Sequence, residues 1–214
     1  MLHHADEVRI DYSNMLSVLV SKEEKLFIIH KDVVCAKSRF FAAACSRKDY
    51  IESQEKIVRL PELDVVAFQS YVHWVYKDIV QHDLDQGKSE YERYEKLLRN
   101  VRLYVLADML QDLGLRNKAM DAFIDACTLP PPGLLPSIGV LNYVFENTPA
   151  SSPMRHMLVD LHIARQNREQ AAGKVDLWPR DYVNAVAIKT LAIAPGMSVD
   201  KYRGGRAKYM EPEE

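Results

Sequence analysis

The sequence is poor in cysteine and glycine, and it has no long apolar run. Its three cysteines, Cys35, Cys45 and Cys127, include no Cys-x-x-Cys pair, so we interpret them as buried, reduced thiols without a redox or metal-binding role. Reduced thiols are typical of the cytoplasm or nucleus, which is the predicted location. The 8 glycines are scattered, which excludes a glycine-rich phosphate-binding loop. The apolar runs fall far short of the roughly 20 residues of a membrane span, so we expect no membrane association.

The sequence also lacks the residue groupings of a catalytic or metal site. Ser38 and Ser46 have no Gly-x-Ser-x-Gly setting, the pattern of a serine nucleophile in many hydrolases. His30 has only Lys31 and Asp32 beside it, whereas a metal site needs several convergent ligands. We therefore expect no catalytic residue, no metal and no cofactor, and predict that the chain is not an enzyme. An enzyme whose site is assembled from scattered residues stays as an alternative.

Charge gives little support for a nucleic-acid partner. The formal net charge is −2, so no overall basic field attracts phosphates. The segment Tyr202–Tyr209 is basic and flanked by aromatic residues, a pattern that contacts phosphates and stacks bases in some RNA-binding proteins. Because it occurs once, beside the acidic end Glu211–Glu214, we interpret it as a solvated tail.

The sequence does contain enough apolar residues for a core, and their pattern begins with short strands. The composition is 48% hydrophobic and 27% charged, typical of a globular protein. Leu16–Val20 and Leu26–Ile29 are predicted strands, and the polar stretch Ser21–Lys25 between them predicts a hairpin. Ile57–Pro61 resembles a further strand. Since the first two strands are apolar at nearly every position, we expect helices on one face of the sheet and shielding of the other.

Helical patterns fill most of the remaining chain. A helix is predicted from about Lys31, and Asp64 is a predicted N-cap for another. Behind Asp64, apolar residues recur with helical spacing as far as about Tyr76. Residues 78–87 are predicted to form a loop, and a helix from Tyr91 onward is apolar on two sides. Gly114 is predicted to stop that helix, and another follows to about Ala126.

The run Pro130–Pro132 is the best candidate for a domain boundary. Before it, we predict one α+β domain over residues 14–128, preceded by an arm over residues 1–13. After it, we predict an all-helical extension over residues 133–195, with one helix beginning at Ser152–Pro153. The polar, glycine-containing residues 196–214 are predicted to form a disordered tail.

The ordered motifs of the first domain resemble the BTB/POZ family, particularly its fungal members. The resemblance runs from about Tyr12 to Ala126 and includes two long motifs and a helix pair. The first motif comprises Phe27, His30, Lys31, Val34, Ser38, Phe40 and Phe41. The second comprises Glu52, Ile57, Leu60, Pro61, Phe68, Tyr71, Trp74 and Tyr76. The helix pair is marked by Leu106, Ala107, Asp108, Leu113, Gly114, Leu115 and Asn117.

The resemblance implies a BTB/POZ fold, a small β-sheet flanked by helices, and a role in protein–protein interaction. It implies association with a second copy or with another BTB protein through the first helices and neighbouring strands. The candidate interface residues are Leu16, Val18, Val33, Val34, Lys37, Phe40 and Phe41. Asn14 and Met15 stand where family members with a charged pocket have an acidic residue, so this chain departs from that pocket. The alternative function is that of a substrate adaptor bound to a cullin scaffold in a ubiquitin ligase.

Overall fold

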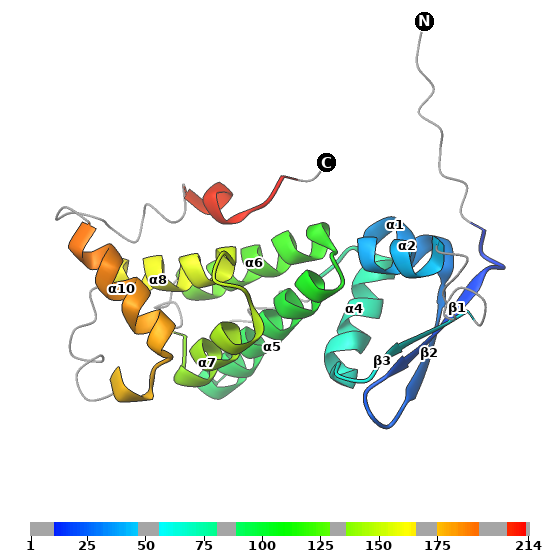
Figure 1. Ribbon diagram of the computed structural model, residues 1–214, viewed down its shortest axis with the longest axis horizontal. Helices are drawn as coiled ribbons and strands as arrows, with labels where there is room; N and C mark the ends of the chain where they lie inside the picture. Colours follow the sequence, from blue (N-terminus) through cyan, green and yellow to red (C-terminus); the bar gives the residue numbers. More distant parts are fainter. Residues whose placement is uncertain are drawn as a thin grey trace, which may run out of the picture. The chain divides into compact units, whose positions relative to one another are not determined.

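The computed structural model describes residues 11–46, 56–80, 89–128, 136–165, 175–192 and 205–212. The chain divides into two compact units (Figure 1). Unit 1 comprises residues 1–79 and 106–112, and unit 2 comprises residues 80–105 and 113–214. This division differs from the predicted boundary at Pro130–Pro132, because the helix Leu113–Thr128 packs with the extension rather than with the sheet. Gly114 lies inside this helix, so the prediction that it stops the preceding one is wrong.

Unit 1 contains a sheet of three strands among the described residues. They are β1 (Met15–Val20), β2 (Lys25–His30) and β3 (Ile57–Leu60), arranged in the order β2-β1-β3. β1 and β2 form the predicted antiparallel hairpin, and β3 runs parallel to β1. Their register places Val18 of the central strand between Phe27 and Val58. Because side chains alternate along a strand, one face of this sheet carries Leu16, Val18, Val20, Ile29 and Val58, all of them buried.

Three helices complete unit 1 and cover that buried face. They are α1 (Lys31–Lys37), α2 (Arg39–Ser46) and α4 (Val65–Lys77). The Phe68 ring meets Phe27 of β2 edge-on at a centroid distance of 5.0 Å. Tyr71 lies 6.3 Å from Phe41 of α2 in a stacked arrangement. Aromatic side chains therefore join the helices to the sheet.

Local capping chemistry sets the ends of α4 as the sequence predicts. The Asp64 carboxylate accepts a hydrogen bond of 2.8 Å from the backbone N–H of Ala67, which confirms the predicted N-cap. The helix ends at Lys77, and the capping residue Asp78 has a φ of 55°, in the left-handed region. Trp74 donates from Nε1 to Asp112 at 3.0 Å, so the segment 106–112 is bonded into unit 1.

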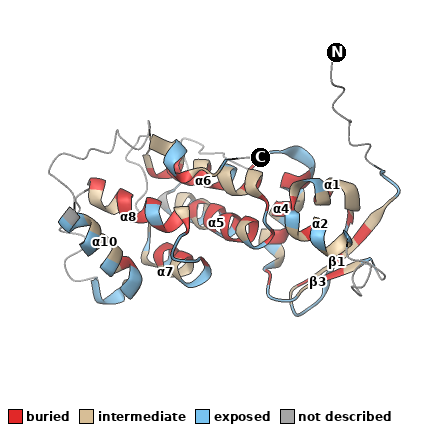
Figure 2. Ribbon diagram, turned by 45° about the horizontal axis from the view of Figure 1, so that its top comes forward, coloured by how far each residue is buried: buried red, intermediate tan, exposed pale blue. Residues whose placement is uncertain are grey.

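All regular elements of unit 2 among the described residues are helices. Its elements are α5 (Glu90–Met109, of which residues 90–105 belong to unit 2), α6 (Leu113–Thr128), α7 (Ile138–Asn147), α8 (Pro153–Arg165), η1 (Val175–Leu177), α10 (Arg180–Ala192) and η2 (Arg206–Tyr209). The helix after Ser152 begins at Pro153, as predicted. Buried residues from α5, α6, α7 and α8 form one continuous core, visible as the red stretches of these helices in Figure 2. The α+β fold class with a helical C-terminal region is thus confirmed.

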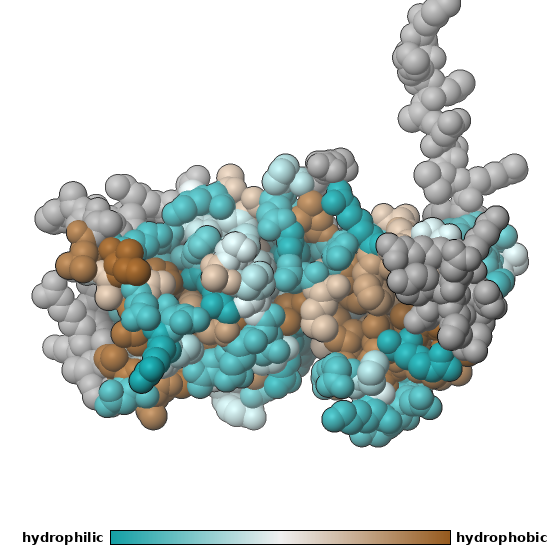
Figure 3. Space-filling model, viewed as in Figure 1, coloured by the Kyte–Doolittle hydropathy of each residue, from teal (hydrophilic) through white to brown (hydrophobic). Residues whose placement is uncertain are grey.

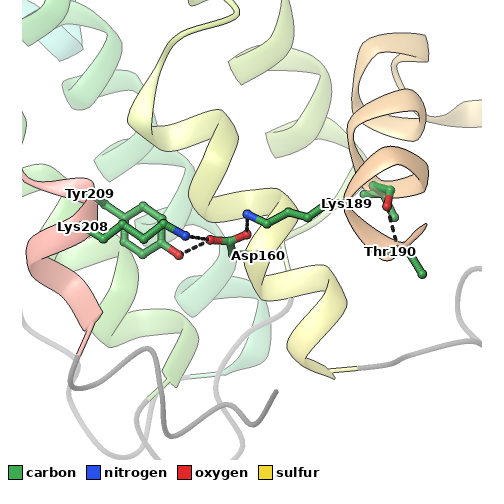
Figure 4. A network of polar contacts seen from close by, with 6 residues as sticks. Asp160, Lys189, Thr190, Lys208 and Tyr209 are labelled. Atoms are coloured by element: carbon green, nitrogen blue, oxygen red, sulfur yellow. Dashed lines mark hydrogen bonds and ion pairs between the residues drawn. The ribbon is translucent and has the colours of Figure 1, made fainter. Parts of the chain in front are cut away.

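The C-terminal segment contradicts part of the predicted disordered tail. Residues 205–212 are described, and η2 packs against α6 and α8. Tyr209 is only 3% exposed, and its hydroxyl donates to the buried Asp160 carboxylate at 2.5 Å. Lys208 and Lys189 pair with the same carboxylate, so Asp160 joins α8, α10 and η2 (Figure 4). Composition alone missed this packing because the partner carboxylates lie far away in the sequence.

Several predictions fall outside the described residues. They are most of the N-terminal arm (residues 1–10), the motif residue Glu52, part of the predicted loop (residues 81–87), the run Pro130–Pro132, and residues 196–204 and 213–214 of the tail.

Candidate functional site

Four of the seven candidate interface residues are buried within unit 1. Leu16 and Val18 of β1, Val34 of α1 and Phe41 of α2 are each at most 1% exposed. The physical reason is that β1 is the central strand, and its even-numbered side chains point toward the covering helices. In this structure these four side chains build the core and present no surface to a partner.

The other three candidates keep partial exposure. Val33 and Phe40 are half-buried on α1 and α2, and Phe40 packs edge-on against Phe41 at 5.3 Å. Lys37 forms an ion pair with Asp78, and its ammonium group lies 4.7 Å from the centre of the Trp74 ring. Lys37 is thus already engaged inside unit 1 by a carboxylate and an aromatic face.

The opposite face of the sheet carries the exposed apolar side chains of this unit. Leu26 and Ile28 of β2 are 50% and 59% exposed. Register pairs Leu26 with Leu19, and the half-buried Met15 and Ile57 belong to the same set of alternating positions. We call the surface of Met15, Leu19, Leu26, Ile28 and Ile57 the outer sheet face.

The exposure of this face contradicts the prediction that the sheet is shielded on both sides. Among the described residues, nothing buries Leu26 or Ile28, although both are large aliphatic side chains. β2 is also an edge strand in the described sheet, and edge strands offer backbone groups to another chain. Figure 3 shows apolar surface around α4 and the neighbouring strands of unit 1.

One end of the outer sheet face is bordered by an aromatic and histidine cluster. Leu26, Ile28 and His30 are alternate residues of β2, so they share the outer face of the sheet. The His30 backbone N–H donates to the Tyr76 hydroxyl at 3.0 Å. The His30 ring nitrogen Nδ1 lies 2.8 Å from the same hydroxyl, and Tyr12 meets the ring edge-on at 5.3 Å. Tyr12 and Tyr76 are both exposed. An apolar centre with aromatic residues at its border is the composition enriched in protein interfaces.

This surface was not predicted, because β2 is apolar at nearly every position and its two faces therefore look alike in the sequence. The useful signal in the sequence is the charged turn Lys22–Lys25 before β2, whereas the edge position of β2 comes only from the structure. Period-two alternation then separates Leu26 and Ile28 from Phe27 and Ile29. The inner pair meets the helices, while the outer pair is left exposed.

Unit 2 offers a cavity among its described residues. The cavity has a volume of about 320 Å³ and is lined by Asn142, Phe145, Glu146, Leu177, Trp178, Pro179, Arg180 and Asp181. Within the described ranges, no group of three or more His, Cys, Asp or Glu side chains is placed to hold a metal ion. None of the helices in those ranges is both long and apolar enough to cross a membrane.

Two basic residues of the segment that suggested RNA contacts, Arg206 and Lys208, are engaged by carboxylates, and Arg203 lies outside the described residues. Arg206 forms ion pairs with Asp121 at 2.7 Å and with Asp125 at 2.8 Å. These two carboxylates raise the pKa of Arg206, chiefly through the hydrogen bond to Asp125. Lys208 pairs with Asp160 at 2.6 Å. The charges of both side chains are thus balanced within unit 2, which weakens their attraction for phosphates.

Comparison with protein families agrees with these observations. The family model of the BTB/POZ domain matches residues 13–114, a segment that takes in the sheet, α1, α2, α4 and α5. The match therefore includes all of the outer sheet face and the helices that cover the other side of the sheet. Residues 13–114 thus match the BTB/POZ domain, a kind of domain that is a protein–protein interaction module.

Proposed function

We propose that this chain associates with a second copy of itself, or with another BTB chain, through the outer sheet face. The observation that carries the proposal is the exposure of Leu26 and Ile28 beside other apolar side chains on an edge strand. Covering such a half-exposed aliphatic side chain contributes on the order of 1 kcal/mol. In a symmetric dimer each residue is buried twice, so the two positions together contribute four such terms.

The outer sheet face alone is smaller than a standard interface, which buries roughly 1,600 Å² in total. We therefore infer that neighbouring exposed groups complete the contact. The aromatic residues Tyr12 and Tyr76 adjoin the face through His30. Of the predicted interface residues, Val33, Lys37 and Phe40 keep some exposure and stay candidates for a separate contact through α1 and α2.

The test compares two double variants by sedimentation velocity over a range of protein concentrations. L26S/I28T removes the apolar surface of β2, and we expect it to raise the dimer dissociation constant at least about tenfold. The control I188T/L191S changes two exposed side chains of α10 in unit 2, and we expect it to leave the constant unchanged. A V33T variant examines the predicted contact through α1 separately.

Two outcomes would contradict this proposal. The first is a wild-type chain that stays monomeric at tens of micromolar, where a dimer of roughly micromolar affinity persists. The second is a dimer that L26S/I28T leaves intact while V33T dissociates it, which would place the contact on α1. Mixing the chain with a labelled BTB partner distinguishes association between different chains from self-association.

A second proposal is the role of substrate adaptor on a cullin scaffold. The observation in its favour is the cavity of unit 2, whose lining includes the aromatic residues Phe145 and Trp178 beside Arg180 and Asp181. Such a cavity can accept an apolar side chain of a substrate, while the charged groups of the lining fix the orientation of that substrate. Purified cullin immobilised on beads should retain the full chain, and absence of retention would remove this function without affecting the first proposal.

A further inference from the structure

Two of the three cysteines lie together on neighbouring helices of unit 1. Cys35 belongs to α1 and Cys45 to α2, and both are half-buried rather than enclosed. Cys127, by contrast, is fully buried in the core of unit 2. The prediction of three buried thiols is therefore wrong for Cys35 and Cys45, which are partly exposed.

The connection between α1 and α2 is fixed by hydrogen bonds around Ser38. The Ser38 backbone N–H donates to the Val34 carbonyl at 2.9 Å. Its hydroxyl donates to the Leu110 carbonyl at 2.5 Å and accepts from the Phe41 N–H at 3.1 Å. Because Ser38 is buried and fully engaged, the two helices and the thiols that they carry are held in one arrangement.

The two sulfur atoms are joined by a hydrogen bond that distinguishes them chemically. The Cys35 thiol donates to the Cys45 sulfur, which lowers the pKa of Cys45 to about 7 and raises that of Cys35. Burial opposes the first shift, whereas the positive charge of Lys31 supports it. The Lys31 ammonium group lies 3.5 Å from the Cys45 carbonyl oxygen. The other ionisable groups acting on the pair are Asp32, which raises the pKa of Cys35, and Tyr71 on α4.

We propose that Cys45 and Cys35 form a peroxide-reactive thiol pair, in which Cys45 is the nucleophile and Cys35 the resolving thiol. A thiolate is the reactive form of cysteine, and a partly exposed thiol beside a cation is the setting in which it persists. The neighbouring Cys35 provides the second sulfur that converts the first oxidation product into a disulfide. The product would connect α1 to α2 covalently.

The reaction consumes one hydrogen peroxide molecule for each disulfide. The Cys45 thiolate attacks one peroxide oxygen, the O–O bond breaks, and the departing hydroxide is protonated to water. Cys45 is then a sulfenic acid. The Cys35 sulfur attacks the Cys45 sulfur, the S–O bond breaks, and the leaving hydroxide takes the Cys35 proton as a second water. Two thiols are oxidised to one disulfide, and the peroxide is reduced to two waters.

The experiment treats the reduced full chain with hydrogen peroxide and maps its peptides by mass spectrometry without reduction. We expect a Cys35–Cys45 linkage in the wild type and in the control C127S. In C35S, which lacks the resolving thiol, we expect sulfenic acid to accumulate at Cys45, where dimedone traps it. The rate of Cys45 oxidation should rise with pH through about 7, because the thiolate fraction rises there.

A lysine pair separates the proposed electrostatic effect from general damage to the fold. K31Q removes the cation beside Cys45 and should slow its oxidation several-fold, whereas K22Q in the exposed turn should not. Circular dichroism shows whether each variant is folded. If C35S is not folded, the presence or absence of the Cys35–Cys45 linkage in the wild-type peptide map decides the proposal. Dimedone on Cys35 instead of Cys45, or no linkage between the two at any peroxide concentration, would overturn the proposal.

Discussion

The two units stabilise distant parts of the chain by different chemistry. Unit 1 joins its helices to the sheet mainly through buried aliphatic and aromatic side chains, and it leaves Leu26 and Ile28 exposed. Unit 2 has a larger apolar core, but it adds charged contacts between its C-terminal segment and its helices. These contacts centre on Asp121, Asp125 and Asp160.

The difference indicates separate roles for the two units. An apolar face costs free energy while it is in contact with water, and a second chain that covers it removes that cost. Charged contacts such as those of Arg206 instead satisfy their groups within the same unit. The outer sheet face of unit 1 is thus an apolar surface that a second chain could cover, whereas the C-terminal charges of unit 2 are bound within that unit.

The largest expected effect comes from the core of unit 1. Phe68 is fully buried and contacts Phe27 and Tyr71, so F68A should lower the free energy of unfolding by roughly 3–5 kcal/mol. The chain has two tryptophans, Trp74 in unit 1 and Trp178 in unit 2. Urea unfolding of the W178F and W74F backgrounds therefore reports on each unit separately.

If F68A lowers the urea midpoint reported by Trp74 and leaves that reported by Trp178 unchanged, units 1 and 2 are stabilised independently. The control is V66T on the same helix, because Val66 is exposed and its truncation leaves no cavity. An F68A transition that coincides with that of wild type would mean that this face of α4 is not part of the core. Equal shifts at both tryptophans would mean that the two units unfold together.

Local features of the fold were predictable from the sequence because their causes lie within a few residues. The hairpin of β1 and β2 follows from two apolar runs around a polar turn. The start of α4 follows from a carboxylate at Asp64 and backbone N–H groups immediately after it. The start of α8 follows from Ser152–Pro153. In each case the stabilising contact and the sequence signal are the same residues.

The candidate site was predicted less well because it depends on which strand lies at the centre of the sheet. Leu16 and Val18 were predicted to contact a partner, but the central position of β1 buries them. The exposure of Ile28 depends on the edge position of β2, which period-two alternation alone does not reveal. The contact between Cys35 and Cys45 likewise requires the packing of α1 on α2. Contacts of this kind arise from tertiary structure.

A smaller effect is expected from the charged network of unit 2. D160N removes one carboxylate that Lys189, Lys208 and Tyr209 share. We expect a loss of about 1–3 kcal/mol in the free energy of unfolding, since a buried hydrogen-bonded carboxylate is replaced while both lysines keep some contact with water. The Trp178 transition in urea measures this loss.

Proteolysis gives a second measure of the same network. In D160N the segment carrying Tyr209 should become a site of early cleavage, because its anchoring hydroxyl bond to Asp160 is weakened. The control D176N changes an exposed acidic residue of the same unit and should have neither effect. Wild-type stability in D160N, with no faster cleavage, would show that the apolar contacts of Tyr209 suffice to hold the segment.

The smallest expected effect is a dependence of unit 2 on pH. Burial lowers the pKa of His162, whose ring lies 5.2 Å from Trp178 and 5.8 Å from Tyr182. The unfolded chain then binds a proton at His162 at a higher pH than the folded chain does. Above the ordinary histidine pKa of about 6.5 both states are neutral there, and the full stability is present. As the pH falls below that value, the free energy of unfolding decreases.

Urea unfolding at a series of pH values from 7.5 to 5.5, reported by Trp178, measures this slope. H162F should make the slope shallower, because it removes the proton site and keeps an aromatic ring between Trp178 and Tyr182. H73Q, at an exposed histidine of unit 1, should leave the slope unchanged. His156, whose pKa is lowered by burial and by Lys189 and Lys208, accounts for part of what remains in H162F. A slope equal in H162F and wild type would mean that His162 binds its proton as readily in the folded chain as in the unfolded one.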